Sequence, residues 1–354
     1  MTSRDGLRRF RGTRGPRPFG GLRGWGGVSA MAGACVLTAS LTLLPLSHSV
    51  AERPEDAPQR TATAVPATTA AECQEPERSV PASGDDGPSI RKIKERENKK
   101  LIIGVDQNSY QWGYLNPDTK EPQGFDIDLA RAIAKDIVGS EKDVIFRAIP
   151  TNQRVAALDN GTVDLVVRTM TITCDRIKQV AFSTAYFQTG QQVLAPKGST
   201  ITGFNGSLAG KRVCTADGST AYKALERKSY GAIFEDAHDG TALDEDRLTV
   251  PNQLDCLVRL QLGEVDAVVT DNALAAGQAA QDPAVELVGK PLAPEYYGVA
   301  AKLGNEDLVA RVNKVLDGYR AGGANSLWMT AYDKWLKAAL PGITAPPEAK
   351  YKNG

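Results

Sequence analysis

Two short polar elements of the 354-residue chain carry groups suited to binding a small anion. Arg176 ends the run Met-Thr-Ile-Thr-Cys-Asp-Arg at residues 170–176, and its planar guanidinium can donate two parallel hydrogen bonds to a carboxylate. Residues 217–220, Asp-Gly-Ser-Thr, precede a helix expected to begin near Ala221, where free backbone N–H groups form an anion site. Each element also has a simpler interpretation, as an exposed arginine at a helix start and as a capped turn.

These elements need a scaffold, and the pattern of the chain predicts a mostly parallel sheet. An aliphatic run at residues 100–105 is typical of a buried strand. Residues 125–138 place Leu129, Ile133 and Ile137 on one face of a helix. Short strands are expected at 144–146 and 164–167, with a short helix between them at 152–158. This alternation indicates an α/β fold in which helices cover the sheet.

An internal repeat predicts two similar lobes. Gly-Thr-Val-Asp-Leu-Val-Val at residues 161–167 recurs as Gly-Glu-Val-Asp-Ala-Val-Val at 263–269. Upstream, residues 105–109 have a looser counterpart at 216–220, and each ends an aliphatic strand with a polar turn. The alternative is that such sequences commonly precede strands in α/β proteins, whether or not the chain contains a repeat. Two copies about a hundred residues apart favour two lobes.

The charge of the chain is unevenly distributed. The formal net charge is zero, but residues 1–51 carry seven arginines and one acidic residue, Asp5. The remainder has 35 basic and 41 acidic residues and a net charge of −6. An acidic body offers no basic face, so we expect no nucleic-acid partner.

The first 51 residues are predicted to be an export signal. After the arginines, an uncharged run at residues 24–51 ends in Ser-Val-Ala, which favours cleavage after Ala51 and an extracytoplasmic protein. The run is long enough to stay uncleaved as a membrane anchor. A lipid on Cys35 is the third possibility, although the apolar stretch follows this cysteine. Residues 52–96, rich in Pro, Thr, Ala, Ser and charge, are expected to form a disordered tether.

Export changes the interpretation of the cysteines. Without Cys35, an even number remains for an oxidising compartment, namely Cys73, Cys174, Cys214 and Cys256. None of them has C-x-x-C spacing, and His238 is the remaining histidine. We therefore expect disulfides, with no metal and no cofactor.

Three motifs in matching order resemble the family 3 periplasmic-type amino-acid-binding proteins of ABC importers. They are Gly-Phe-Asp-Ile-Asp-Leu at 124–129, the run at 170–176, and Gly-Glu-Val-Asp-Ala-Val-Val-Thr-Asp at 263–271. The resemblance covers about residues 99–336 and is nearest to actinobacterial glutamate- and glutamine-binding proteins. It implies a monomer with the type II periplasmic-binding-protein fold, in which two α/β lobes enclose the ligand in a cleft. Lobe 1 would comprise 97–192 and 293–341, lobe 2 193–292, and the C-terminal tail 342–354.

The resemblance also implies a function and its residues. The ligand would be a polar amino acid, with glutamate or aspartate favoured over glutamine or asparagine, delivered to an ABC permease. Arg176 matches the arginine that binds the α-carboxylate, and Thr171 matches a residue that donates to the same group. Asp271 matches the acidic partner of the α-ammonium. The remaining matches are Ser219 and Thr220, in the loop that closes from lobe 2, and Asp106, which could line the cleft.

The chain departs from the family immediately before the run at 170–176. Many family members have Ala-Gly at the positions of Arg168 and Thr169. Arg154 resembles the arginine with which glutamate/aspartate binders meet the side-chain carboxylate of the ligand. Two additional cations favour an acidic ligand. Arg154 could instead pair with Asp126 or Asp164.

The family resemblance suggests a Cys214–Cys256 disulfide, which leaves Cys73 to pair with Cys174. Closing a loop of ~42 residues stabilises a fold by ~4 kcal/mol in the chain-entropy model. Two other functions remain open, a sensor that signals to a membrane protein and an enzyme resembling cyclohexadienyl dehydratases. We expect no catalytic residue, because His238 lies far from every motif.

Overall fold

The computed structural model describes residues 73–236 and 248–352, which all belong to one compact unit. The predicted export signal, the first part of the tether and His238 lie outside the described residues. Within the described part, no helix combines the length and the apolar character needed to cross a membrane.

The first of two five-stranded sheets has the strand order β5-β1-β6-β15-β7. Strand β15 runs antiparallel to both of its neighbours, and the other pairs are parallel. Its strands are β1 (Leu101–Val105), β5 (Val144–Ala148), β6 (Leu165–Val166), β7 (Val180–Phe182) and β15 (Ala300–Lys302). Its helices are α2 (Phe125–Val138), α3 (Arg154–Asp159), α7 (Glu306–Arg320) and α8 (Leu327–Trp335). The aromatic residues of α8 serve as packing residues, since Trp328 and Tyr332 are each 1% exposed. We call this part lobe 1.

The second sheet has the order β11-β10-β12-β9-β13 and repeats the first. Its strands are β9 (Gln191–Pro196), β10 (Val213–Ala216), β11 (Thr249–Val250), β12 (Ala267–Asp271) and β13 (Val285–Val288), with helices α4 (Thr220–Arg227), α5 (Gln253–Gln261) and α6 (Asn272–Gln281). The repeated sequence motif supplies β6 in one sheet and β12 in the other, each in third position. Strands β1 and β10, with the looser repeat, both hold second position. We call this part lobe 2.

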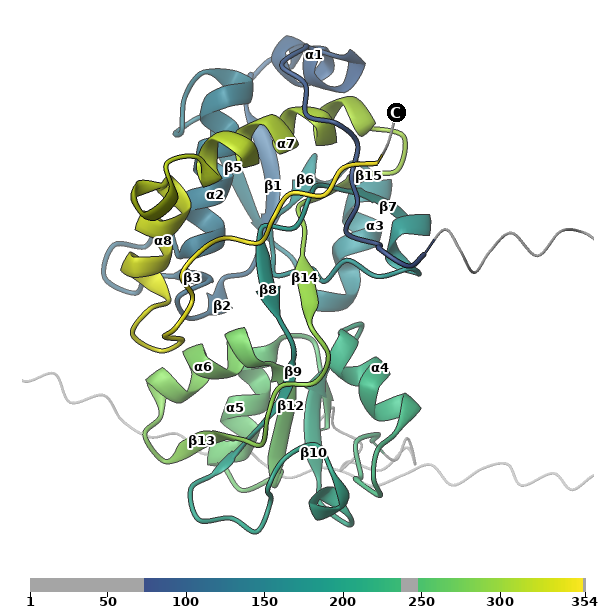
Figure 1. Ribbon diagram of the computed structural model, residues 1–354, viewed down its shortest axis with the longest axis vertical. Coiled ribbons are helices and arrows are strands. Elements are labelled where there is room, and N and C mark those ends of the chain that lie inside the picture. The colour runs from purple at the N-terminus through teal and green to yellow at the C-terminus, as the bar shows by residue number, and fades with distance from the viewer. Residues whose placement is uncertain (1–72, 237–247, 353–354) are drawn as a thin grey trace, which may run out of the picture. The chain divides into compact units, whose positions relative to one another are not determined.

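Two crossover strands connect the sheets (Figure 1). Strand β8 (Phe187–Thr189) leads into β9, and β14 (Glu295–Tyr297) leads into β15. They pair antiparallel, with Glu295 opposite Thr189. Beside them, a small sheet contains β2 (Asn108–Ser109), β3 (Gly113–Leu115) and β4 (Pro122–Gln123). Short 3₁₀ turns include η1 (Thr151–Gln153), η2 (Arg176–Lys178), η3 (Gly206–Leu208) and η4 (Gly323–Asn325).

The N-terminal segment corrects one prediction. Residues 73–96, expected to be a disordered tether, are folded and include α1 (Pro88–Glu95). Ile90 and Ile93 of α1 are 0% and 3% exposed and pack into the core of lobe 1. The hydroxyl of Ser79 donates to the carbonyl of Phe182 at 2.6 Å. The prediction was wrong because it rested on the low apolar content of this segment. Two buried isoleucines and hydrogen bonds to distant residues help to hold the segment on lobe 1.

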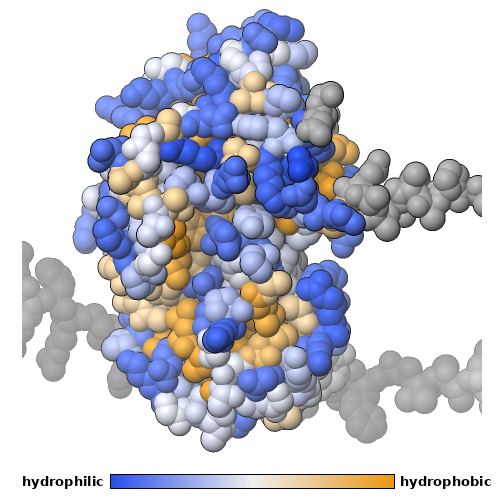
Figure 2. All heavy atoms as spheres, viewed as in Figure 1, coloured by the Kyte–Doolittle hydropathy of each residue, from blue (hydrophilic) through white to orange (hydrophobic). Residues whose placement is uncertain are grey.

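The C-terminal tail is likewise packed as far as residue 352. Tyr351 forms a parallel bridge with Ser79, and its hydroxyl donates to Asp317 at 2.6 Å. Residues 340–343 and 345–347 line a groove of about 450 Å³ with Phe187, Gln188 and Thr189 of β8. On the same face, apolar side chains gather on the part of lobe 2 nearest the crossover strands (Figure 2). The tail thus lies along the connection between the sheets.

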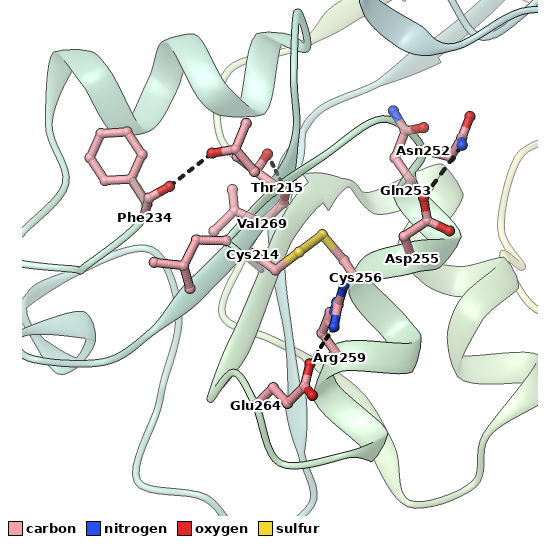
Figure 3. Close-up of a disulfide and its surroundings, with 12 residues drawn as sticks. Cys214, Thr215, Phe234, Asn252, Gln253, Asp255, Cys256, Arg259, Glu264 and Val269 are labelled. Atoms are coloured by element: carbon pink, nitrogen blue, oxygen red, sulfur yellow. Dashed lines mark hydrogen bonds and ion pairs between the residues drawn. A yellow bond between two sulfur atoms is a disulfide. The ribbon is translucent and has the colours of Figure 1, made fainter. Parts of the chain in front are cut away.

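Both predicted disulfides are present. Cys214 of β10 and Cys256 of α5 are fully buried and joined by a 2.01 Å S–S bond (Figure 3). This bond fixes α5 against the second sheet. Cys73 and Cys174, 101 positions apart, are joined with a Cα–Cα distance of 5.7 Å. The second bond attaches the start of the folded segment to the run that contains Arg176.

Candidate ligand-binding site

The carboxyl ends of four strands bring the predicted residues together, as is usual for ligand sites of open α/β sheets. In lobe 1, Asp106 follows β1 and residues 168–171 follow β6. In lobe 2, residues 217–220 follow β10, and Asp271 is the last residue of β12. Hydrogen bonds connect the two sets.

Arg176, at the start of η2, reaches from lobe 1 to lobe 2. Its guanidinium donates to the carbonyl of Thr171 at 2.7 Å and to the carbonyl of Gly218 at 2.9 Å. Burial lowers the pKa of Arg176, and the charges of Asp271 and Glu295 raise it. No carboxylate of the described residues forms an ion pair with it. The guanidinium is therefore placed by carbonyl groups and has no anionic partner of its own.

The loop at 217–220 approaches lobe 1 closely. Gly218 has φ +70°, and a Cβ there would lie 2.9 Å from the Cα of Asn152, so only glycine fits. The Ser219 hydroxyl accepts from the N–H of Tyr222 at 3.0 Å and so caps α4. This hydroxyl, predicted to bind the ligand, is therefore already engaged in a hydrogen bond. The Thr220 hydroxyl lies 3.5 Å from that of Thr171.

Asp271 forms a polar cluster with residues that the sequence did not suggest. The Tyr297 hydroxyl donates to its Oδ2 at 2.5 Å, and the Gln191 amide donates to its Oδ1. Glu295 lies beside it and accepts from Thr220 at 2.8 Å and from Gln191 at 3.1 Å. Burial and the charge of Glu295 raise the pKa of Asp271 to about 7. Two carboxylates at one end of the site can therefore receive a cation.

Arg154 is a buried cation. Its side chain donates to the carbonyl of Thr151 at 2.8 Å, and to those of Arg168 and Gly218 at 3.4 Å. The residue is 4% exposed, and burial with the charges of Arg176 and Arg168 lowers its pKa well below the usual value.

The two anticipated partners of Arg154 are engaged elsewhere. Asp164 pairs with Arg96 at 2.7 Å, and Asp126 accepts from the Tyr186 hydroxyl at 2.9 Å. Among the described residues, no ion pair of Arg154 is found.

Arg168 differs from Arg154 because its charge is compensated within lobe 1. Its guanidinium forms an ion pair with Asp106 at 3.0 Å, and both side chains are buried. It also donates to the Thr151 hydroxyl at 3.0 Å and to Asn252, beside α5 of lobe 2, at 3.3 Å. The Thr151 hydroxyl donates to Gln253 at 3.3 Å. These contacts connect the lobes and engage both terminal nitrogens of the Arg168 guanidinium, while its buried Nε atom has no partner among the described residues.

Thr169 is held in an unusual backbone conformation. Its φ of +40° lies in the left-handed region, which is strained for a β-branched residue. Its N–H donates to Asp126 at 3.0 Å and lies 3.1 Å from the Tyr186 hydroxyl oxygen. Burial raises the pKa of Asp126 to about 7. Asp126, from the first family-like motif, thus fixes the strand end from which Thr171 and Arg176 follow.

Three residues of the site were missed, namely Gln191, Glu295 and Tyr297. Glu295 and Tyr297 are two positions apart on β14, so both side chains point to one side of the strand. The spacing of Glu295 and Tyr297 by two positions was visible in the sequence. Their position beside Asp271 depends on how the crossover strands pass between the sheets, which the sequence did not show.

Comparison with known proteins gives consistent matches over this region. A sequence model of the bacterial extracellular solute-binding proteins, family 3, matches residues 101–338. The ABC transporter glutamine-binding protein of Bacillus subtilis is 35% identical over 242 residues, covering 68% of this chain and 83% of that protein. The L-glutamate/L-aspartate-binding protein of Pseudomonas aeruginosa is 27% identical over 261 residues, covering 72% and 81%. The solved solute receptor for L-cysteine of Neisseria gonorrhoeae has a TM-score of 0.62 and 26% identity, covering 71% and 94%.

Proposed function

The chain belongs to family 3 of the bacterial extracellular solute-binding proteins, and we propose that it binds a polar α-amino acid for delivery to an ABC permease. Its fold is the two-lobed type II periplasmic-binding-protein fold. The protein would act outside the cytoplasm, which agrees with the family and with two disulfides. The predicted export signal, its possible anchor and the monomeric state remain predictions.

The arrangement of charges supports an α-amino acid as the ligand. Burying a zwitterion is costly unless each charge meets a partner. Arg176 and the N-terminus of α4 would receive the α-carboxylate, with Thr171 donating beside them. Asp271 would receive the α-ammonium. Both kinds of partner are contributed by loops at the carboxyl ends of the strands.

The buried and unpaired Arg154 favours an acidic side chain, and this observation carries the choice of ligand. A buried guanidinium that only carbonyl groups accompany is stabilised strongly by an incoming carboxylate. Glutamate or aspartate would supply this group, whereas glutamine or asparagine would offer only a carbonyl. The relatives named as glutamine-binding and as glutamate/aspartate-binding are consistent with either choice. Arg168, already paired with Asp106, contributes less to the proposal than the sequence suggested.

Titration calorimetry of the purified protein with glutamate, aspartate, glutamine, asparagine and arginine tests this function. We expect binding of the acidic amino acids to be tightest, that of the amides to be weaker, and that of arginine to be undetectable, because its side chain would meet Arg154. Tightest binding of arginine would contradict the assignment of Arg154. Absence of binding by all five would contradict an amino-acid ligand of this class.

A further inference from the structure

Glu295 occupies a position from which it can contact a ligand held by Asp271. It lies on the crossover strand β14, and its carboxylate accepts from the Thr220 hydroxyl at 2.8 Å and from the Gln191 amide at 3.1 Å. The same amide nitrogen donates to Asp271, so one NH₂ group bridges two carboxylates. Glu295 is partly exposed, whereas Gln191 is 1% and Asp271 7% exposed. The cluster therefore begins in the buried interior and ends at an accessible carboxylate.

The cluster has too few hydrogen-bond donors. The Gln191 nitrogen lies within hydrogen-bond distance of three acceptors, on Thr220, Asp271 and Glu295, but it carries only two hydrogens. The Gln191 carbonyl oxygen, Oε1, is buried and has no partner among the described residues. An unpaired buried acceptor is costly and calls for a donor. Two carboxylates and one amide oxygen therefore face a shared shortage of donors.

We propose that Glu295, Asp271 and the Oε1 atom of Gln191 together form a three-acceptor subsite for the ammonium of the ligand. An –NH₃⁺ group has three donors and one positive charge, which matches one free oxygen and two carboxylates. The inference rests on the proposed function and adds Glu295 and Gln191 to the residues that bind the ligand. The site would select a protonated primary amine, and an N-alkylated or deaminated analogue would leave one or more acceptors unpaired.

The charges around Asp271 give this subsite a second signature. Glu295 and Tyr297 face it from β14, Gln191 from β9, and the arginines Arg176 and Arg154 contribute positive charge from η2 and α3. Replacing Glu295 with a neutral residue removes the nearest negative charge. The pKa of Asp271, which the Glu295 charge helps to raise, would then fall, and so would the pH at which binding weakens.

The test compares Glu295→Gln with Glu286→Gln, a matched change at an exposed position of β13. Both variants and the unmodified protein are titrated with L-glutamate, with L-glutamine, and with glutarate, which lacks the amine. We expect Glu295→Gln to weaken the binding of both amino acids at least about tenfold, the loss of affinity expected when a hydrogen bond to a charged group is removed. Binding of glutarate should weaken far less or improve. Glu286→Gln should change nothing.

A pH series tests whether the Glu295 charge acts on Asp271, and the comparison with glutarate tests contact with the ammonium. With L-glutamine, the midpoint of binding should shift to lower pH in Glu295→Gln. Amino-acid affinities within threefold of those of Glu286→Gln, or a loss for glutarate equal to that for L-glutamate, would overturn the inference while leaving the amino-acid function intact. If the unmodified protein bound neither amino acid, the proposed function would fall, and the inference with it. Thermal unfolding without ligand verifies that each variant is folded.

Discussion

The guanidinium of Arg168 lies 3.0 Å from the carboxylate of Asp106, and the two side chains are 0% and 5% exposed. The pair joins the end of β6 to the end of β1. Three backbone or hydroxyl donors, from Gln107, Asn108 and Ser109, also point at Asp106. Its charge is thus satisfied without a ligand. Arg168 in turn extends to Asn252 of lobe 2, so this ion pair supports the contact between lobes.

Replacing Arg168 should therefore affect stability more than ligand preference. Arg168→Met leaves Asp106 buried without its cation, and we expect the free energy of unfolding to fall by about 3–5 kcal/mol. Adding Asp106→Asn should recover much of this loss, because the remaining groups are neutral. Urea unfolding of both variants measures the effect. A changed preference between glutamate and glutamine at unchanged stability would instead assign Arg168 to the ligand.

Arg154 should determine that preference. Arg154→Met keeps much of the volume and removes the charge, so binding of glutamate or aspartate should weaken by about 2–5 kcal/mol. Glutamine and asparagine should lose much less, because neither brings a second carboxylate. Titration calorimetry measures both, with the exposed Arg147→Met as the matched control. Equal losses for acids and amides would make Arg154 a structural residue.

Arg176 should be required for every α-amino acid. Arg176→Ala removes the guanidinium that Thr171 and Gly218 place, and a buried α-carboxylate would lose its charge partner. We expect no detectable binding of any of the twenty amino acids in a thermal-shift screen, in which ligands normally raise the unfolding temperature by mass action. The variant without ligand should unfold within a few degrees of the original protein. Retained affinity would place the carboxylate elsewhere.

Ligand binding should weaken below pH 7. The pKa of Asp271 is raised to about 7, so the free protein gains a proton on this carboxyl as the pH falls. A bound ammonium favours the charged carboxylate and lowers its pKa in the complex, so affinity is greatest above pH 7 and falls by at most about tenfold per pH unit below it. Titrations with L-glutamine between pH 5 and 8.5 measure the slope. Asp271→Asn should bind weakly at every pH and abolish the slope, which separates Asp271 from Asp126, whose pKa is also raised to about 7.

The two disulfides should have different effects on binding. Each stabilises the fold by about 4–5 kcal/mol in the chain-entropy model. Cys174, however, lies two positions from Arg176, whereas Cys214 and Cys256 lie in the core of lobe 2. Serine substitution of Cys73 and Cys174 should weaken ligand binding and speed hydrogen exchange at residues 73–96. Serine substitution of the other pair should lower stability with affinity retained below the unfolding temperature, and the reverse pattern would contradict this distinction.

The sequence supported predictions where the signal was local or repeated. The motif at 161–167 and 263–269 marked β6 and β12, and the cysteine pairing that the family resemblance implied is present in the structure. Contacts between distant segments were harder to foresee. Arg168 is neutralised by Asp106, 62 positions away, and the crossover strand β14 places Glu295 where it shares the Gln191 amide donor with Asp271. Local composition also could not reveal that the segment around Ser79 is held by Phe182, Asn313 and Tyr351.

The bridge between Ser79 and Tyr351 brings the start and the end of the folded chain to the same lobe. Ser79 is bound to β7 and α7, and Tyr351 to α7, all of which belong to lobe 1. A pulling force applied at either terminus is therefore borne by lobe 1 and does not pass along β8 and β14. Neither of these attachments restrains lobe 2 directly. We therefore expect a biosensor immobilised through either end to keep its response, and a second attachment on lobe 2 to restrict any movement between the lobes.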